Sequence, residues 1–468
     1  MGGSAPSPSG GGALAAEVRR LAAPAILHSC LQTLVFVVDR AMLGHLGEAP
    51  LAAMQIAGTL EWSLFSVLLA FEVGTIARVG FWVGAREKAD AQAAALVSLA
   101  MASVVGAIVM VASPLVLARL SWLAPRASAA TLAEAHAYLA VMLPASPLVF
   151  VATTAVAVLQ ASGDTRTPLL VASVCNVLHV GLNRVLILGA LGVPALGTRG
   201  CALSTAATFA VEGALLLLAL QRPSSRLSLR GSFRAIVPRA REKVREIVRV
   251  AAPSVLERAL YHVGFMGFVV MIGRLGDRVM ASNQALITLE SVCFLSADGF
   301  AVAAAALVAQ KLGAGDAVAA ARAARIATRD AVIVVSGLGV AIFLARNVIV
   351  GLLVDDARVV AVTTGAVFVL MIAQPFMSSS IVLAQSLRGA GKTRVVLAVT
   401  SFCALVVRLG STYLYAFGPA ARPGADETES LRAVWWGSTT DWMVRAVLLL
   451  VVVRFVLARR PREAPVAA

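Results

Sequence analysis

Long apolar runs follow one another along the chain, separated by short segments of polar residues. A backbone in lipid must satisfy its hydrogen bonds within the segment, so apolar runs of about 20 residues predict membrane-spanning helices. The runs are continuous instead of alternating, which is not the pattern of a transmembrane barrel. We count about twelve spans, near residues 20–44, 51–82, 91–120, 132–160, 167–189, 197–220, 246–273, 280–311, 324–353, 360–388, 393–417 and 432–457. The pattern predicts an all-α polytopic membrane protein.

The chain also matches itself when it is shifted by 229 positions. Ala22-Ala23-Pro24 falls on Ala251-Ala252-Pro253, and Thr59-Leu60-Glu61 falls on Thr288-Leu289-Glu290. About a third of positions 22–85 are identical to their counterparts, so we infer an internal repeat. Each copy holds six spans, an even number, so both enter the membrane from the same side. We therefore expect two six-helix bundles related by a pseudo-two-fold axis along the membrane normal.

This repeat divides the chain into lobes and connecting segments. Residues 1–13 are rich in Gly, Ser and Pro and predict a disordered tail without the order of a signal peptide. The remaining divisions are a first lobe at 14–220, a basic cytoplasmic linker at 221–245, a second lobe at 246–458 and a cytoplasmic tail at 459–468.

Composition supports the membrane assignment. Hydrophobic residues make up 59% of the chain and charged residues 14%, whereas a soluble domain is nearer half and a quarter. The formal net charge of +15 is concentrated in the segments predicted to be cytoplasmic, above all in 222–249. This asymmetry predicts that both termini are cytoplasmic. It also favours anionic lipid headgroups, and not nucleic acid, as the partner of the basic surface.

Several kinds of chemistry are disfavoured. The five cysteines are scattered within apolar runs without metal or disulfide spacing, so we expect small core residues and no metal site. Gly389–Thr393 looks like the end of a phosphate-binding loop, but Ser386 stands where its first Gly is required. We therefore expect no nucleotide binding. No nucleophile–base pair lies at membrane depth, so we do not expect an enzyme.

Short motifs along nearly the whole chain resemble the multidrug and toxic compound extrusion (MATE) family, within the multidrug/oligosaccharidyl-lipid/polysaccharide exporter superfamily. They lie at Val38–Gly44, Gln160–Pro168, Gly197–Thr205, Ala304–Asp316 and Leu387–Arg394. Pro253–Glu257 is more similar to the bacterial DinF-like and NorM-like branch than to eukaryotic members. The resemblance implies twelve helices, cation-coupled export of organic compounds and a place in the bacterial plasma membrane. We expect a monomer.

Asp39 is the strongest candidate for a coupling residue. It follows the apolar run Leu34–Val38, and a charged Asp at the centre of a membrane helix costs roughly 2.5–3.5 kcal/mol. Because burial favours the neutral carboxyl, such a group can bind a proton in one state and release it in another. The alternative is a structural pair with Arg40 or another base, although helix neighbours do not face each other. In the resembled family, the acid of this motif couples transport to a cation.

The fifth predicted helix departs from the family pattern. Related proteins carry Asn-x-x-x-Asp there, whereas this chain has His179 and Asn183 at those positions. Asn183 cannot lose a proton, so Asp39 is expected to work nearly alone. Its expected polar supports are Asn176, His179, Asn183 and Thr205. His179 can titrate near neutral pH, but we favour the alternative of a packing histidine.

The second lobe offers weaker candidates for coupling or substrate contact. They are Glu257, Tyr261, Gln284, Glu290 and Gln374. Tyr261 and Gln374 stand where many members of the resembled family carry acids, which leaves few carboxylates for sodium and favours protons. Glu257 has an alternative role as the partner of Arg258 or Lys243 at the membrane surface.

Candidates for a substrate cleft are Glu61, Phe65, Met266 and Phe294. Glu61 and Glu290 occupy equivalent positions in the two repeats, and we favour a structural role for this pair. The aromatic residues have plain packing as their alternative.

The resulting hypothesis is a secondary antiporter. It exports bulky, cationic, amphipathic compounds in exchange for protons by alternating access, with no cofactor other than H⁺. Two alternatives stay open, a sodium-coupled drug antiporter and a lipid-linked oligosaccharide flippase of the same superfamily.

Overall fold

The computed structural model describes residues 9–44, 46–123, 128–231, 238–354, 356–422 and 424–457. Within these ranges the chain is helical and contains no strand, which confirms the predicted all-α class. Ten helices within the described residues are long and apolar enough to cross a membrane, or eleven if the bent pair of residues 129–142 and 146–161 forms one span. The first expected span lies in α1 (Ser9–Gly44), whose start falls inside the predicted tail.

The helices form two compact units. The N-lobe unit is Leu27–Ala251 and the C-lobe unit joins residues 1–26 to 252–468. The first contains α2 (Glu48–Leu68), η1 (Leu69–Phe71), α3 (Glu72–Gly84), α4 (Lys88–Ala118), α5 (Leu120–Leu123), α6 (Ala129–Met142), α7 (Ser146–Ala161), α8 (Arg166–Leu186) and α9 (Gly197–Gln221). The second contains α12 (Asp277–Gly313), α13 (Ala317–Leu344), α14 (Arg346–Leu353), α15 (Ala357–Gly389), α16 (Thr393–Phe402), the π-helical η2 (Cys403–Arg408), α17 (Leu409–Ala416) and α18 (Glu427–Leu457).

Two helices pass from one unit to the other. Helix α1 starts in the C-lobe unit and continues into the N-lobe unit, and α11 (Ala240–Gly273) makes the opposite passage. Pro24 and Pro253, at equivalent positions of the repeat, lie inside these helices close to the points of passage. A proline within a helix removes one backbone hydrogen bond and favours a bend there. The units therefore differ from the lobes expected at 14–220 and 246–458, each of which contained the start of its own first helix.

The start of each crossing helix is held by equivalent contacts in the two units. Trp82 donates its indole N–H to Glu246, with 3.1 Å between Nε1 and Oε2. Lys311 Nζ donates to Glu17 Oε2 at 3.0 Å. Glu17 and Glu246 are repeat counterparts, and so are Trp82 and Lys311. The residues that hold the start of each repeat's first helix in the other unit are therefore found in both copies of the repeat.

Glycine allows the backbones to approach at both contacts. A Cβ atom on Gly74 would lie 2.7 Å from the carbonyl oxygen of Ile247, and one on Gly299 would lie 2.6 Å from the nitrogen of Ile26. Real Cβ atoms do not approach backbone atoms so closely, so a larger residue would displace the helix that packs against it.

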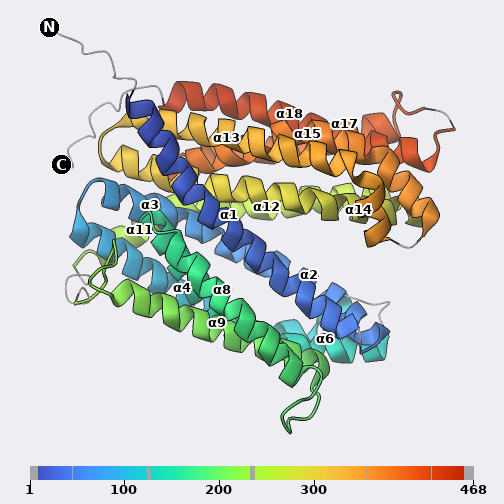
Figure 1. Cartoon of the computed structure of the whole chain (residues 1–468), viewed down its shortest axis with the longest axis horizontal. Coiled ribbons are helices and arrows are strands. Elements are labelled where there is room, and N and C mark those ends of the chain that lie inside the picture. Colours follow the sequence, from blue (N-terminus) through green and yellow to red (C-terminus); the bar gives the residue numbers. More distant parts are fainter. Residues whose placement is uncertain are drawn as a thin grey trace. The chain divides into compact units, whose positions relative to one another are not determined.

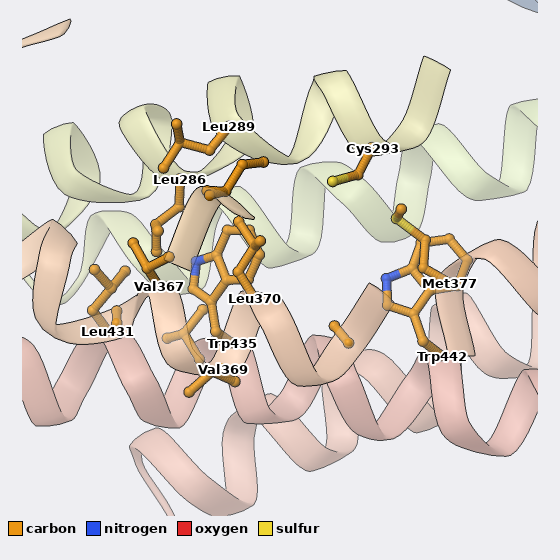
Figure 2. Packing of buried hydrophobic residues seen from close by; sticks show 14 of the residues in the cluster. Leu286, Leu289, Cys293, Val367, Val369, Leu370, Met377, Leu431, Trp435 and Trp442 are labelled. Atoms are coloured by element: carbon orange, nitrogen blue, oxygen red, sulfur yellow. The ribbon is translucent and has the colours of Figure 1, made fainter. Parts of the chain in front are cut away.

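The interior of the C-lobe unit lies among α12, α15 and α18, which pack side by side (Figure 1). Figure 2 shows how their apolar side chains meet, with the rings of Trp435 and Trp442 reaching from α18 toward α15 and α12. The buried indole of Trp435 donates to Asn283 Oδ1 at 3.1 Å. Buried polar atoms of this kind need a partner, and this one is satisfied.

Four of the five cysteines are buried as expected, but Cys30 is exposed and does not belong to the core. Gly391 has a φ of 71° in the turn between α15 and α16, so the segment Gly389–Thr393 ends one membrane helix and begins the next. Residues 1–8, 232–237 and 458–468, which contain parts of the predicted tails and linker, lie outside the described residues.

Candidate functional site

Asp39 lies inside the N-lobe unit, 2% exposed, against helix α8. Its Oδ1 atom is 2.7 Å from Nε2 of His179 and 2.7 Å from Nδ2 of Asn183. His179 and Asn183 are four residues apart, so they lie one above the other on the same helix face. Arg40, the neighbour proposed as a structural partner, is exposed and does not form this contact.

The sequence of α8 explains why these two side chains point inward. Its buried residues are Pro168, Ala172, Cys175, His179 and Asn183. Spacings of three and four residues place them on one stripe of the helix, which is the face that packs in the lobe. The polar cluster is therefore built into the buried face of an otherwise apolar helix.

The second ring nitrogen of His179 shows how protons fit this cluster. Nδ1 is 3.2 Å from Oγ1 of Thr208, and the Thr208 hydroxyl donates to the carbonyl of Ser204 at 2.7 Å. A hydroxyl has one hydrogen, so the Thr208 oxygen is left to accept from Nδ1–H. Nε2 lies 2.7 Å from Oδ1 of Asp39 and 3.0 Å from Nδ2 of Asn183. The Asp39–His179 contact has room for one proton, either on the ring beside a carboxylate or on the carboxyl beside a neutral ring.

Glu61 adds a second carboxyl to this region. It is 8% exposed and lies close to the Tyr138 hydroxyl and to Asp39. Cys201 lies near both acids. Within the described residues, Asp39 and Glu61 form no ion pair with lysine or arginine.

The other two predicted supports bond to their own helices. Asn176 donates to the carbonyl of Ala172 at 2.8 Å, and Thr205 donates to that of Cys201 at 3.0 Å. Both residues line a cavity of about 20 Å³ that also borders His179. They are neighbours of the cluster and do not contact Asp39 directly.

Glu212 on α9 borders the same cavity and was missed by the sequence analysis. It is 4% exposed and accepts a hydrogen bond from Gln32 Nε2 at 3.4 Å. The signal that singled out Asp39, an acid in an apolar membrane helix, was present here too.

The second lobe holds its acids differently. The carboxylate of Glu257 is paired with the guanidinium of Arg388, at 2.5 and 3.4 Å. The expected partners, Arg258 and Lys243, were wrong. Lys243 instead pairs with Asp90 at 2.9 Å within the N-lobe unit, because the start of α11 packs there.

A buried ion group in the C-lobe unit was also missed. Asp441 is fully buried, and Nη2 atoms of Arg408 and Arg445 both lie 2.8 Å from its Oδ2 atom. The two guanidinium groups lie 5.3 and 4.6 Å from the centre of the Trp442 ring. Arg408 also lies 5.8 Å from the ring of Phe268, which is the repeat counterpart of Asp39.

The remaining coupling and substrate candidates belong to the C-lobe unit. Tyr261 and Glu290 lie near Arg408. Gln374 is fully buried and donates to the carbonyl of Leu370 at 2.8 Å, whereas Gln284 is exposed.

Of the predicted cleft residues, Phe65 is buried in the core, with its ring edge against Phe150 at 5.1 Å between centroids. Met266 is 61% exposed and Phe294 is 40% exposed. Phe65 therefore has the packing role that was its stated alternative, while Met266 and Phe294 remain accessible side chains.

Comparison with known families decides the identity of the fold. The family model named MatE matches residues 24–185 and again residues 253–414. The chain belongs to the MATE family. The two matches start 229 positions apart, as the internal repeat does. MATE proteins are membrane transporters and not enzymes, in agreement with the sequence analysis.

Relatives extend this assignment along the chain. A probable multidrug resistance protein NorM of Thermotoga maritima is 26% identical over 394 residues, 84% of each chain. One of Burkholderia mallei is 29% identical over 451 residues, 93% of this chain and 91% of the relative. An outward-facing multidrug resistance MATE transporter has the same fold, with a TM-score of 0.85 at 20% identity over 95% and 96% of the two chains.

Proposed function

We propose that this MATE protein is a secondary multidrug efflux antiporter that exports bulky organic compounds in exchange for protons. Its relatives are named as multidrug resistance proteins, which supports drug efflux. The observation that carries proton coupling is the buried Asp39–His179–Asn183 cluster. The proposal includes a bacterial plasma membrane location with both termini cytoplasmic, amphipathic cations as substrates and a monomer among membrane lipids.

The cluster suits a proton better than a sodium ion. The atoms nearest the Asp39 carboxylate are Nε2 of His179 and Nδ2 of Asn183. An amide NH₂ group and a protonated ring nitrogen are donors, and they repel a metal cation. A sodium site would need several oxygen ligands in their place. Protonation of Asp39 needs no additional ligand.

Protonation would change the contacts of Asp39 in two ways. It removes the negative charge to which the His179 imidazolium donates, and it adds an O–H group that needs an acceptor. Asn183 Oδ1 is buried without a hydrogen-bond partner among the described residues and can accept it if the amide turns. The cluster thus has a hydrogen-bonded arrangement for each charge state, as an alternating cycle requires.

The cycle follows from these states. In the outward-facing protein, proton uptake by Asp39 promotes substrate release, and in the inward-facing protein, proton loss allows the next substrate to bind. One proton moving through 100 mV supplies about 2.3 kcal/mol. Fully coupled, this would support a gradient of nearly fiftyfold for a neutral substrate.

The test is ethidium efflux from proteoliposomes under an imposed proton or sodium gradient. We expect proton-driven efflux in the wild type and none in Asp39→Asn, which keeps the shape of the side chain but cannot titrate. Glu72→Gln is the matched control, because Glu72 is another acid of the same lobe that contacts Thr154 and not His179. It should transport like the wild type.

Three outcomes would contradict the proposal. Efflux driven only by sodium would reject the coupling ion, and proton-driven exchange retained in Asp39→Asn would reject the coupling residue. Absence of efflux under both gradients would favour the oligosaccharide flippase.

A further inference from the structure

We propose that Glu212 is a second proton-carrying carboxyl, joined to Asp39 through His179, Thr208 and the small cavity between them. The proposal rests on proton coupling at Asp39 and names a further residue for it. Helix α8 contains no acidic residue, and Asn183 beside Asp39 cannot lose a proton. Glu212 supplies a carboxyl from the next helix.

The cavity makes the connection between the two acids. Its volume of about 20 Å³ is enough for one water molecule, which needs two to four polar partners. The residues that line it include His179, Thr208, Gln32 and Glu212, whose side chains carry polar atoms. A single water in the cavity would lie next to both His179 and Glu212.

The surroundings of Glu212 leave its charge unbalanced. The polar and titratable residues that line the cavity with it are Gln32 from α1, Cys175, Asn176 and His179 from α8, and Thr205 and Thr208 from α9. No lysine or arginine lines the cavity or pairs with Glu212 among the residues that the structure describes. An isolated buried carboxylate is costly, so proton binding is the available means of neutralising it.

The order of the groups along the helices gives the proposed proton transfer between Asp39 and Glu212 a direction. Glu212 is one turn beyond Thr208 on α9, about 6 Å along the axis. Its partner Gln32 precedes Asp39 by seven residues on α1, about 10 Å. With both termini cytoplasmic, Glu212 lies on the cytoplasmic side of Asp39. It is therefore placed to pass inward a proton that enters at Asp39.

The transfer step conserves charge. The Nδ1–H bond of the His179 imidazolium breaks and its proton goes to the water or the Thr208 hydroxyl. That group gives up a proton of its own, and a new O–H bond forms on the Glu212 carboxylate. A cation and an anion thus become two neutral groups, and no net charge is added to the lobe interior. The reverse step restores the starting state.

Infrared difference spectroscopy of the reconstituted protein tests Glu212 without requiring transport. Steps between about pH 5 and pH 9 should produce C=O bands of protonated carboxyl groups in the wild type. Glu212→Gln should lose one band, and the matched control Glu72→Gln should keep it. Asp39→Asn should shift the pH midpoint of the Glu212 band, because the two acids share His179.

Efflux measurements then test the role in coupling. Under a proton gradient, Glu212→Gln should slow ethidium efflux about tenfold or more, with KM changed less than about twofold. Thr208→Val leaves Glu212 in place and removes the hydroxyl of the relay. In Thr208→Val the Glu212 band should remain, but adding Asp39→Asn should no longer shift its pH midpoint, and efflux should be slower. This variant tests the connection between Asp39 and Glu212 even if Glu212→Gln fails to fold.

The two proposals fail in distinguishable ways. A wild type without proton-driven efflux would reject proton coupling, and the infrared bands would still show whether Glu212 titrates. Glu212→Gln with the wild-type carboxyl bands would overturn the second site. So would proton-driven efflux in Glu212→Gln that equals that of Glu72→Gln.

Discussion

In the N-lobe unit, Asp39, Glu61 and Glu212 are buried beside histidine, tyrosine and glutamine side chains. In the C-lobe unit, Glu257 and Asp441 are buried beside arginine. A carboxylate with a guanidinium partner stays ionised, whereas one without a cation can be neutralised by a proton. The two lobes share a sequence repeat, but these particular acids differ in whether an arginine neutralises them.

The difference is sharpest at one pair of equivalent positions. In the N-lobe unit the first helix presents Asp39 to His179 on the fifth helix. In the C-lobe unit the first helix presents Phe268 to Arg408, also on the fifth helix. Arg408 is in turn neutralised by Asp441 from the sixth. One copy of this contact joins a carboxyl to an imidazole, and the other places an aromatic ring against an arginine that is paired with an aspartate.

The largest effect is expected for Asp441→Asn. This substitution leaves two buried arginines without their carboxylate, and breaking a buried ion group of this kind typically costs about 3–5 kcal/mol. Thermal unfolding of the detergent-purified protein should show a large loss of stability for Asp441→Asn. The same measurement on Asp39→Asn should show a smaller loss of stability, because the His179 ring can release its proton and become neutral, whereas the two arginines stay charged.

The exposed pair Arg422–Glu429 provides the control, because Glu429→Gln should have almost no effect on unfolding. Equal losses for Asp441→Asn and Asp39→Asn would remove the distinction between the lobes.

An intermediate effect is expected for Glu257→Gln. The Glu257 carboxylate is 9% exposed and its partner Arg388 is 16% exposed, so water partly compensates the loss. Arg388 also keeps its hydrogen bond to Gln385. The free energy of unfolding should fall by about 1–3 kcal/mol. Proton-driven efflux per folded molecule should be unchanged, and a loss of coupling in this variant would assign a proton role to the C-lobe unit.

The smallest effect is expected for Asp356→Ala, at an acid outside the membrane-spanning segments. Asp356 caps α15 and accepts from the backbone N–H groups of Val359 and Arg358, at 3.1 and 2.7 Å. These bonds hold the pKa of its carboxyl below the ordinary value. The wild type should therefore unfold at a slightly higher temperature than Asp356→Ala at neutral pH.

The stability that the Asp356 carboxylate adds to the wild type decreases as the pH falls. Because the folded-state pKa is lowered, the contribution is complete above the ordinary pKa of about 3.9 and is lost as the pH falls through the lower value. Unfolding temperatures of the two proteins should converge in acid. A difference that persists at low pH would mean that the carboxylate charge is not what stabilises this cap.

Much of the fold could be predicted from the sequence because lipid imposes a simple rule on the chain. Continuous apolar runs predicted the helices, and the repeat was readable without any structure. Asp39 could be recognised because an acid in such a run is costly. His179 and Asn183 were expected as its polar supports and both contact it, but the favoured role of His179 as a packing residue did not include this direct contact, which depends on how α1 and α8 pack.

Other parts of the site were missed although their signal was present. Glu212, Arg408 and Asp441 stand in apolar runs like Asp39, and Asp441 precedes Arg445 by four residues, the spacing of a helical ion pair. The pairing of Arg408 with Asp441 and of Glu257 with Arg388 joins separate helices. Charge patterns along the chain do not reveal such pairs, so the expected partners of Glu257 were wrong.

The crossing of α1 has a consequence for biosynthesis. Leu14, Val18 and Leu21 complete a core whose other members, such as Phe300 and Val382, are encoded nearly 300 residues or more downstream. During translation the N-terminal segment leaves the ribosome long before the helices that cover it exist. Until the last third of the protein has been made, its apolar face must stay in contact with lipid or be covered by the insertion machinery.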